Sequence, residues 1–168
     1  MFARQFIDSQ DFAYNSRETR GKVPVAEMPR LQDVLASSAG EIDYVVRGLH
    51  SRGGKPMLEV VLDGLCQLRC QRCLQGFSYP VKLVSHLILV PADELDESAD
   101  DEDEIDSIPA DTRLDVVALL EEELLLSLPF APKHPEGTCR PAIEGYVAEE
   151  MDRTVKNPFA VLAELKKK

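Results

Sequence analysis

The four cysteines of this chain are its clearest candidates for chemistry. Cys70 and Cys73 are separated by two residues, Cys66 lies four residues before Cys70, and Cys139 follows far downstream. Sulfurs at CxxC spacing can converge on one metal ion or form a reactive dithiol. Free cysteines are also often buried as small hydrophobic side chains. The pattern therefore leaves three interpretations: a metal site, a redox pair and structural thiols.

The metal interpretation starts from the place of Cys70 and Cys73 at the end of a β-rich run, which is typical of a zinc knuckle. A second half is available in the proline-rich segment 129–141, which we expect to be an extended loop. The predicted ligands of a Cys3His zinc site are Cys70, Cys73, His134 and Cys139. Because the second half is not a close CxxC pair, the spacing falls short of a paired zinc motif.

Two alternatives concern the same cysteines. Cys66 could replace His134 as the fourth ligand, although its leucine-rich surroundings favour a buried thiol. A thioredoxin-like dithiol would use Arg72 to stabilise a thiolate. That motif needs a helix after its first cysteine, whereas a strand is predicted here.

Length and composition indicate one domain over residues 1–168. The chain is 44% hydrophobic and carries a net charge of −11. Ten acidic residues and no Lys or Arg lie between Asp93 and Asp106, and setting those ten aside leaves a net charge of −1. Dense like charge resists packing, so we expect an acidic flexible loop at about 93–108 on a nearly neutral body.

Segments that target or cross membranes are not predicted. The N-terminal residues 1–8 are interrupted by charges and amides, unlike a signal peptide, and no apolar run approaches the length of a membrane span. We therefore expect a cytoplasmic protein without a membrane partner, whose cysteines are thiols or metal ligands.

Alternating apolar residues predict a sheet. The runs 42–49 and 56–63 flank Ser51-Arg52-Gly53-Gly54, which is typical of a hairpin turn. Further β-rich runs cover 65–70 and 77–90. The spacing favours an antiparallel sheet that could curve into a partial barrel.

Helices are predicted at three places. A short helix is expected over 29–35, and a leucine-rich helix over about 112–128 begins near a Thr112 to Asp115 capping box and ends at Pro129. Glu121, Glu122 and Glu123 would form its solvated patch. The run 157–168 has helix-capping residues at its start and lysines at its end, which predicts a C-terminal helical tail. The fold class is thus α+β, with short helices near both termini.

Catalysis is poorly supported by the remaining residues. His50 falls in the hairpin turn and His86 inside a strand, and the carboxylates cluster where no fixed geometry would hold them. Neither a nucleophile elbow nor an HExxH motif is present. We expect a protein that is not an enzyme and has no small-molecule substrate. Scattered arginines and lysines in the first half leave RNA contact open.

Several motifs resemble the YceD family, the large ribosomal RNA subunit accumulation proteins. They are the segment 70–74 followed by Phe77, the segment 123–129 followed by Pro132, His134 and Cys139, the ending 157–162, and the early Pro29-Arg30-Leu31. Their order and spacing cover essentially the whole chain. Some members of that family carry more cysteines after the leucine-rich helix, where this chain has His134 and Cys139.

The resemblance implies a bacterial, cytoplasmic, non-enzymatic factor that supports accumulation of 23S ribosomal RNA and assembly of the large subunit. Its partners would be ribosomal RNA, large-subunit ribosomal proteins or assembly factors. Two other functions stay open: a zinc- or thiol-based redox sensor, and an interaction module that binds through the acidic segment.

Overall fold

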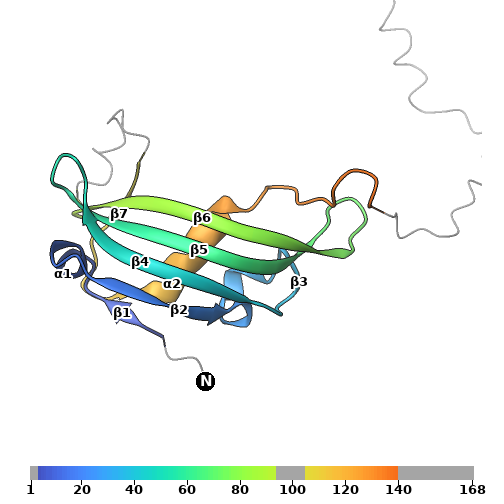
Figure 1. Cartoon of the computed structure of the whole chain (residues 1–168), viewed down its shortest axis with the longest axis horizontal. Coiled ribbons are helices and arrows are strands. Elements are labelled where there is room, and N and C mark those ends of the chain that lie inside the picture. The colour runs from blue at the N-terminus through green and yellow to red at the C-terminus, as the bar shows by residue number, and fades with distance from the viewer. Residues whose placement is uncertain (1–3, 94–104, 140–168) are drawn as a thin grey trace, which may run out of the picture.

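A six-stranded mixed sheet forms the body of the protein in the computed structural model, which describes residues 4–93 and 105–139. The strand order is β2-β4-β5-β6-β7, and β3 pairs with β5. Figure 1 shows the long strands running side by side with one helix behind them. The strands are β2 (Glu18–Pro24), β3 (Leu35–Ser37), β4 (Glu41–His50), β5 (Pro56–Arg69), β6 (Gly76–Val90) and β7 (Asp106–Pro109).

The predicted hairpin is confirmed as the antiparallel pair β4–β5. Its turn is closed by the Ser51 N–H, which donates to the Lys55 carbonyl at 2.9 Å, and Gly54 adopts a φ of 77° that suits glycine. The run 65–70 is not a separate strand, because β5 continues through it to Arg69. The sheet is open, since the described edge strands β2 and β7 do not pair with each other.

Strand β7 corrects two expectations from the sequence. It pairs with β6 in parallel, from Leu87 opposite Asp106 to Val90 opposite Pro109, so the sheet is not purely antiparallel. It also places the end of the predicted acidic loop inside the sheet. Only 94–104 of that loop lies outside the described residues, and its flexibility stays a prediction.

A small two-stranded pair joins the N-terminus to the start of the long helix. β1 (Phe6–Ile7) is antiparallel to β8 (Leu114–Asp115). The short helix α1 (Ser9–Tyr14) follows β1 and packs on β4. Gly48 permits this close approach, since a Cβ there would lie 2.7 Å from the Cα of Ala13.

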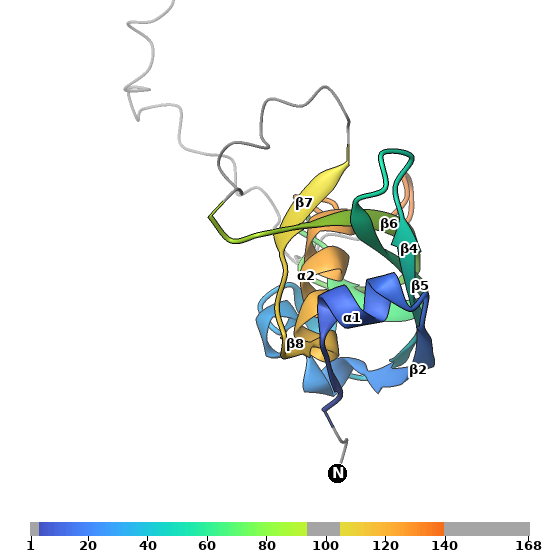
Figure 2. The same ribbon diagram turned by 90° about the vertical axis from the view of Figure 1, so that its left-hand side faces the viewer.

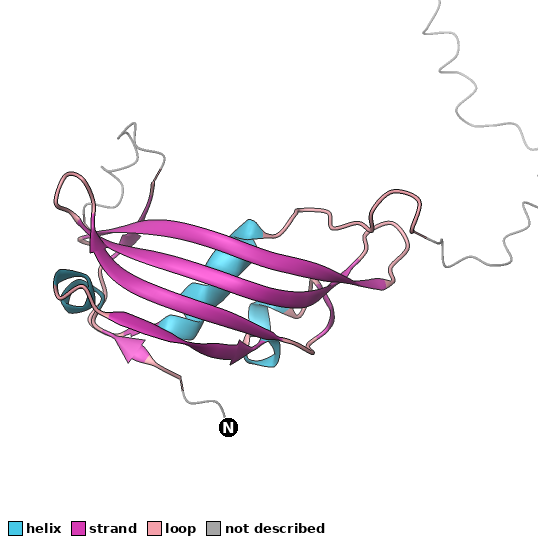
Figure 3. Cartoon of the chain, in the orientation of Figure 1, coloured by secondary structure: helices cyan, strands magenta, loops and turns pink. Residues whose placement is uncertain are grey.

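The long helix α2 (Val116–Ser127) lies within the predicted range 112–128. It begins later than the capping box suggested, because residues 114–115 pair with β1, and the Asp115 carboxylate caps the helix by accepting from the Val117 N–H at 3.0 Å. Figure 2 shows α2 against one face of the sheet, and Figure 3 shows that strands dominate the fold. The buried apolar residues of α2 are Val116, Val117, Leu119, Leu120 and Leu124.

The predicted solvated patch on α2 is largely wrong. Glu121 and Glu123 are buried, and only Glu122 is exposed. The Glu121 carboxylate accepts a hydrogen bond from the backbone N–H of Arg30, which lies in a turn that packs against the helix. This contact gives the buried carboxylate a hydrogen-bond partner. Glu123 interacts with Ser85 on β6. Both glutamates are therefore held by tertiary partners that the local sequence does not indicate.

The helix predicted over 29–35 is replaced by two short 3-10 turns, Val25–Glu27 and Pro29–Leu31. The expected helix cannot continue, because Leu35 enters β3 opposite Leu68. The predicted C-terminal helix over 157–168 lies outside the described residues.

Replacing Glu123 tests the cost of its burial. Burial raises the pKa of Glu123, so the charged form is disfavoured in the folded state, and that penalty is present above the raised pKa and lost at lower pH. Glu123→Gln keeps a partner for Ser85 and should raise the free energy of unfolding at neutral pH. The gain should fade as the pH falls from the raised pKa towards 4.5, the usual pKa of this carboxyl, and should be lost below it.

Chemical denaturation at several pH values measures this difference. Glu122→Gln is the matched control, since the neighbouring side chain is exposed, and should change stability little. A destabilised Glu123→Gln variant at neutral pH would contradict the argument.

Candidate metal centre

The loop 70–75 that joins β5 to β6 builds the first half of the site. The Cys70 N–H donates to the Gln75 carbonyl at 2.9 Å, and the Leu74 N–H donates to the Cys70 carbonyl at 2.8 Å. Leu74 has a φ of 62°, the left-handed conformation that lets the chain reverse so tightly. This turn holds the buried Cys70 and Cys73 on the same side of the loop.

The segment 129–139 after α2 supplies the second half. Pro129 ends the helix, and the buried Pro132 accepts the Gln71 N–H at 2.9 Å, which fastens the segment to the β5–β6 loop. The ring of His134 packs on that of Phe77 with centroids 4.9 Å apart. A turn in which the Thr138 side chain donates to the Pro135 carbonyl at 2.7 Å then brings the chain to Cys139.

The structure brings the four predicted ligands together. The ligand atoms of Cys70, Cys73, His134 and Cys139 all lie within 4.8 Å of one another. The Cys70 and Cys139 sulfurs are 3.8 Å apart, and the Cys73 sulfur is 3.4 Å from Nδ1 of His134.

The Cys70–Cys139 and Cys73–His134 separations suit tetrahedral coordination. Usual zinc–ligand bond lengths place two sulfurs about 3.8 Å apart, and a sulfur about 3.6 Å from a nitrogen, around one ion. Cys70 and Cys73 are buried, while His134 and Cys139 are partly exposed. The group could thus hold a metal ion near the surface, at the end of the sheet where the β5–β6 loop lies.

The electrostatics of the two buried cysteines differ. Burial raises the pKa of Cys70, but the Cys73 backbone N–H donates a hydrogen bond to its sulfur and lowers it. Further hydrogen bonds from His134 and from the Arg72 N–H add to this lowering, and the resulting pKa is about 5. Burial raises the pKa of Cys73, and its neighbours Cys139 and Cys70 raise it further.

Arg72 contributes charge from the middle of the CxxC segment. Its own pKa is raised, first by the hydrogen bond between its guanidinium and Cys139 and then by the charge of that thiolate. A cation at this position compensates part of the negative charge that several thiolates would bring together. The sequence indicated Arg72 as a thiolate partner, although it did not indicate that Cys139 would be the one.

Cys66 lies outside the cluster. It is buried in β5, its sulfur is 3.9 Å from the Tyr79 carbonyl, and burial raises the pKa of its thiol to about 11. The interpretation of Cys66 as a small hydrophobic side chain is confirmed, and its exchange for His134 as a ligand is wrong. The next element after the CxxC turn is strand β6, whereas a thioredoxin-like dithiol needs a helix that begins at its first cysteine.

Two contacts of the site were not indicated by the sequence. The Phe77 ring supports His134, and the Pro132 carbonyl fastens the second half to the first. Both join residues about sixty positions apart, so no local pattern could show them. His50 and His86, the other two histidines, lie on β4 and β6 at the opposite end of the sheet from the β5–β6 loop.

Within the part of the chain that the structure describes, no helix is long and apolar enough to span a membrane. No solved structure matches this chain. The family model for the large ribosomal RNA subunit accumulation protein YceD matches residues 58–166. A protein of that name from Haemophilus influenzae is 32% identical over 123 residues, which cover 67% of this chain and 69% of the relative. The matched range contains all four clustered residues, and the chain belongs to the YceD family.

Proposed function

We propose that this protein supports accumulation of 23S ribosomal RNA, and hence assembly of the large ribosomal subunit, in the bacterial cytoplasm. The family match over 58–166 is the observation that carries this proposal, since the relative is named for large ribosomal RNA subunit accumulation. The protein would act by binding ribosomal RNA, large-subunit proteins or assembly factors, without catalysis. A closed set of four protein ligands supports a structural role for the cysteine cluster, because it leaves no coordination position for a substrate.

Zinc is the metal that the cluster fits best. Three thiols and one imidazole form a soft tetrahedral ligand set, and structural zinc sites commonly use it. A bound zinc ion would cross-link the β5–β6 loop to the segment 129–139. That cross-link would fix the direction in which the chain leaves the body after Cys139.

Removing the gene should lower the ratio of 23S to 16S ribosomal RNA, because large-subunit RNA that fails to assemble is degraded. Quantitative electrophoresis of total RNA measures this ratio, and a plasmid copy of the wild-type gene should restore it. The Cys70→Ser/Cys73→Ser double variant should restore it poorly if the metal centre is required. Cys66→Ala is the matched control and should restore it fully. An unchanged ratio in the deletion strain would refute the proposed function.

Zinc binding has its own test on the purified full-length chain. Elemental analysis should find one zinc per chain in the wild type and in Cys66→Ala, and much less in Cys139→Ser or His134→Ala. If free zinc exceeds the dissociation constant about a thousandfold, binding stabilises the folded state by about 4 kcal/mol. Chelation should then lower the melting temperature by about 10 °C.

The same samples separate the zinc site from a thiol sensor. A metal-free wild type, in which mild oxidation reversibly links Cys70 to Cys139, would overturn the zinc site in favour of the sensor, since these sulfurs are already 3.8 Å apart. Wild type with bound zinc whose clustered thiols resist labelling would exclude the sensor.

The acidic segment is the feature best suited to a basic partner such as a ribosomal protein. Because β7 begins at Asp106 and pairs with β6 in parallel, the connection between them needs its length, so the acidic residues within 94–104 should be replaced by Asn and Gln rather than deleted. The neutralised protein should keep its melting temperature and lose salt-sensitive co-purification with large-subunit components. Unchanged co-purification would show that the partner binds elsewhere.

A further inference from the structure

One face of the sheet is not covered by any helix of the described chain. Figure 1 views the sheet from this face, with α2 behind it, and Figure 2 places α1 and α2 on the same side of strands β4 and β5. Side chains alternate between the two faces of a strand. The buried Val46, Val60 and Leu62 therefore point towards the core, and their neighbours point away from it. We call the side that points away from α2 the outer face.

The outer face carries an apolar stripe. Val45, Val61 and Val84 lie opposite one another across β4, β5 and β6. Four residues further along β5, Leu65 lies opposite Pro80. Val84 is 60% exposed and Leu65 is 54% exposed. An antiparallel sheet with one solvated face usually has polar side chains on that face, so these five residues, the apolar stripe, depart from the common pattern.

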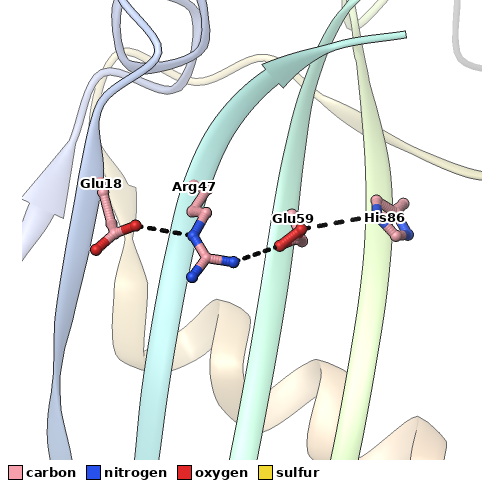
Figure 4. Close-up of polar contacts among 4 residues, drawn as sticks. All are labelled: Glu18, Arg47, Glu59 and His86. Atoms are coloured by element: carbon pink, nitrogen blue, oxygen red, sulfur yellow. Dashed lines mark hydrogen bonds and ion pairs between the residues drawn. The ribbon is translucent and has the colours of Figure 1, made fainter.

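A charged row borders the apolar stripe on one side. Figure 4 shows Glu18, Arg47, Glu59 and His86 side by side in front of the strands, with α2 behind them. Arg47 contacts Glu18 and Glu59 at 2.8 Å each, and Glu59 is 4.0 Å from Nε2 of His86. The members of this row therefore compensate one another, and the row marks one edge of the apolar surface.

A pocket with a volume of about 500 Å³ hollows the outer face on the other side of the valines. Leu65 and Pro80 line it, so the pocket is continuous with the apolar stripe. Two carboxylates, Glu41 and Asp63, and one ammonium group, that of Lys82, also line it. An apolar ligand with an excess of positive charge would match this surface.

The segment 157–168 of the same chain has that composition. Phe159, Leu162 and Leu165 recur at helical spacing, and three lysines follow them. Glu164 is the only acidic residue of the segment. The segment thus offers an apolar side and an excess of cations to a surface that has an apolar stripe and an excess of carboxylates.

The segment also matches the apolar stripe in length. A helix over residues 157–165 would be about 14 Å long. Val61 and Leu65 are four residues apart on β5, which corresponds to about 14 Å along a strand. One such helix would therefore extend from the valines to the pocket.

The position of Cys139 places the outer face within reach of this segment. The Cys139 sulfur is 3.8 Å from that of Cys70, which directly follows β5. Val61 is eight residues before Arg69, or about 27 Å back along the strand. Residues 140–156 can span up to about 60 Å when fully extended. The other face of the sheet is already occupied by α2, so the outer face is the open one.

We infer that the segment 157–168 docks on the outer face, with Phe159, Leu162 and Leu165 on the apolar stripe and the lysines near Glu41 and Asp63. Docking would cover the second face of the sheet with a helix from the same chain. A partner that binds the outer face would then have to displace the segment. The inference is independent of the proposed function.

The test uses the full-length, zinc-supplemented protein with Phe159→p-benzoylphenylalanine, a photoreactive substitution that keeps the aromatic ring. Irradiation of a dilute sample, followed by digestion and tandem mass spectrometry, should join position 159 to residues of the apolar stripe in the same chain. Tyr146→p-benzoylphenylalanine places the same group in the preceding segment and should not give these products.

Substitutions in the apolar stripe test whether the contact is specific. Leu65→Lys/Val84→Lys changes two positions that are more than half exposed, and should lower the crosslinked fraction about tenfold because apolar contacts are lost. Tyr14→Lys/Leu126→Lys is the matched control, since it makes the same kind of change at exposed apolar positions on α1 and α2. This control should leave the crosslinked fraction unchanged.

Substitutions in the segment itself leave every residue of the described body intact. Leu162→Asp/Leu165→Asp should also lower the crosslinked fraction about tenfold, with an unchanged melting temperature. Glu41→Gln/Asp63→Asn should lower it about twofold at low salt, the size expected for exposed ion pairs, and have no effect at high salt.

Three results would overturn the inference. Products at other exposed apolar residues, such as Leu74 or Phe130, would place the segment elsewhere on the body. Products that join two chains would assign the segment to a second copy. A yield no higher than that of the Tyr146 variant would show that the segment does not dock. The proposed function fails separately, since a deletion strain with a normal 23S to 16S ratio would remove it and leave the crosslinks unchanged.

Discussion

Strands β5 and β6 pair along almost their whole length, from Met57 opposite Ile88 to Arg69 opposite Gly76. The cysteine cluster depends on this register. At one end, the loop that closes the pair carries Cys70 and Cys73, and a slip in register would change the span of the CxxC turn. At the other end, Met57 and Ile88 line a pocket beside the β4–β5 turn. Side chains alternate between the two faces of a strand, so a slip of one residue would turn Cys66 out of the core and His86 away from Glu59.

Local patterns in the sequence predicted the elements whose structure depends mainly on neighbouring residues. Two glycines predicted the β4–β5 turn, a leucine-rich run that ends at Pro129 predicted α2, and cysteine spacing indicated the ligand set later found within 4.8 Å. The parallel strand β7, the β1–β8 pair and the burial of Glu121 were not predictable in this way. Each depends on a partner that is distant in the chain. From their sequence neighbours alone, Asp106 and Glu121 are expected to be charged side chains in solvent. The pocket beside the β4–β5 turn was missed for the same reason, since its lining comes from three separate segments.

The parallel pairing of β6 with β7 gives the acidic segment a structural context. Two parallel strands cannot be joined by a tight turn, so a crossover connection of about a dozen residues or more is required. Residues 91–105 make that connection, and they contain nine acidic residues and no Lys or Arg, which account for most of the net charge of −11. The crossover can therefore carry a composition that a packed element could not tolerate. The body around it has nearly balanced charge, which is why the net charge of the chain is a poor guide to what its surfaces bind.

The cysteine cluster lies within the part of the chain that the family model matches. The matched range 58–166 begins within β5 and contains all four clustered residues. Because β5 and β6 are paired over almost all of their length, a metal that orders the β5–β6 loop and the segment 129–139 would fix the exit of the chain after Cys139 relative to the whole sheet. A partner could then contact the sheet and the chain that follows Cys139 in a defined orientation.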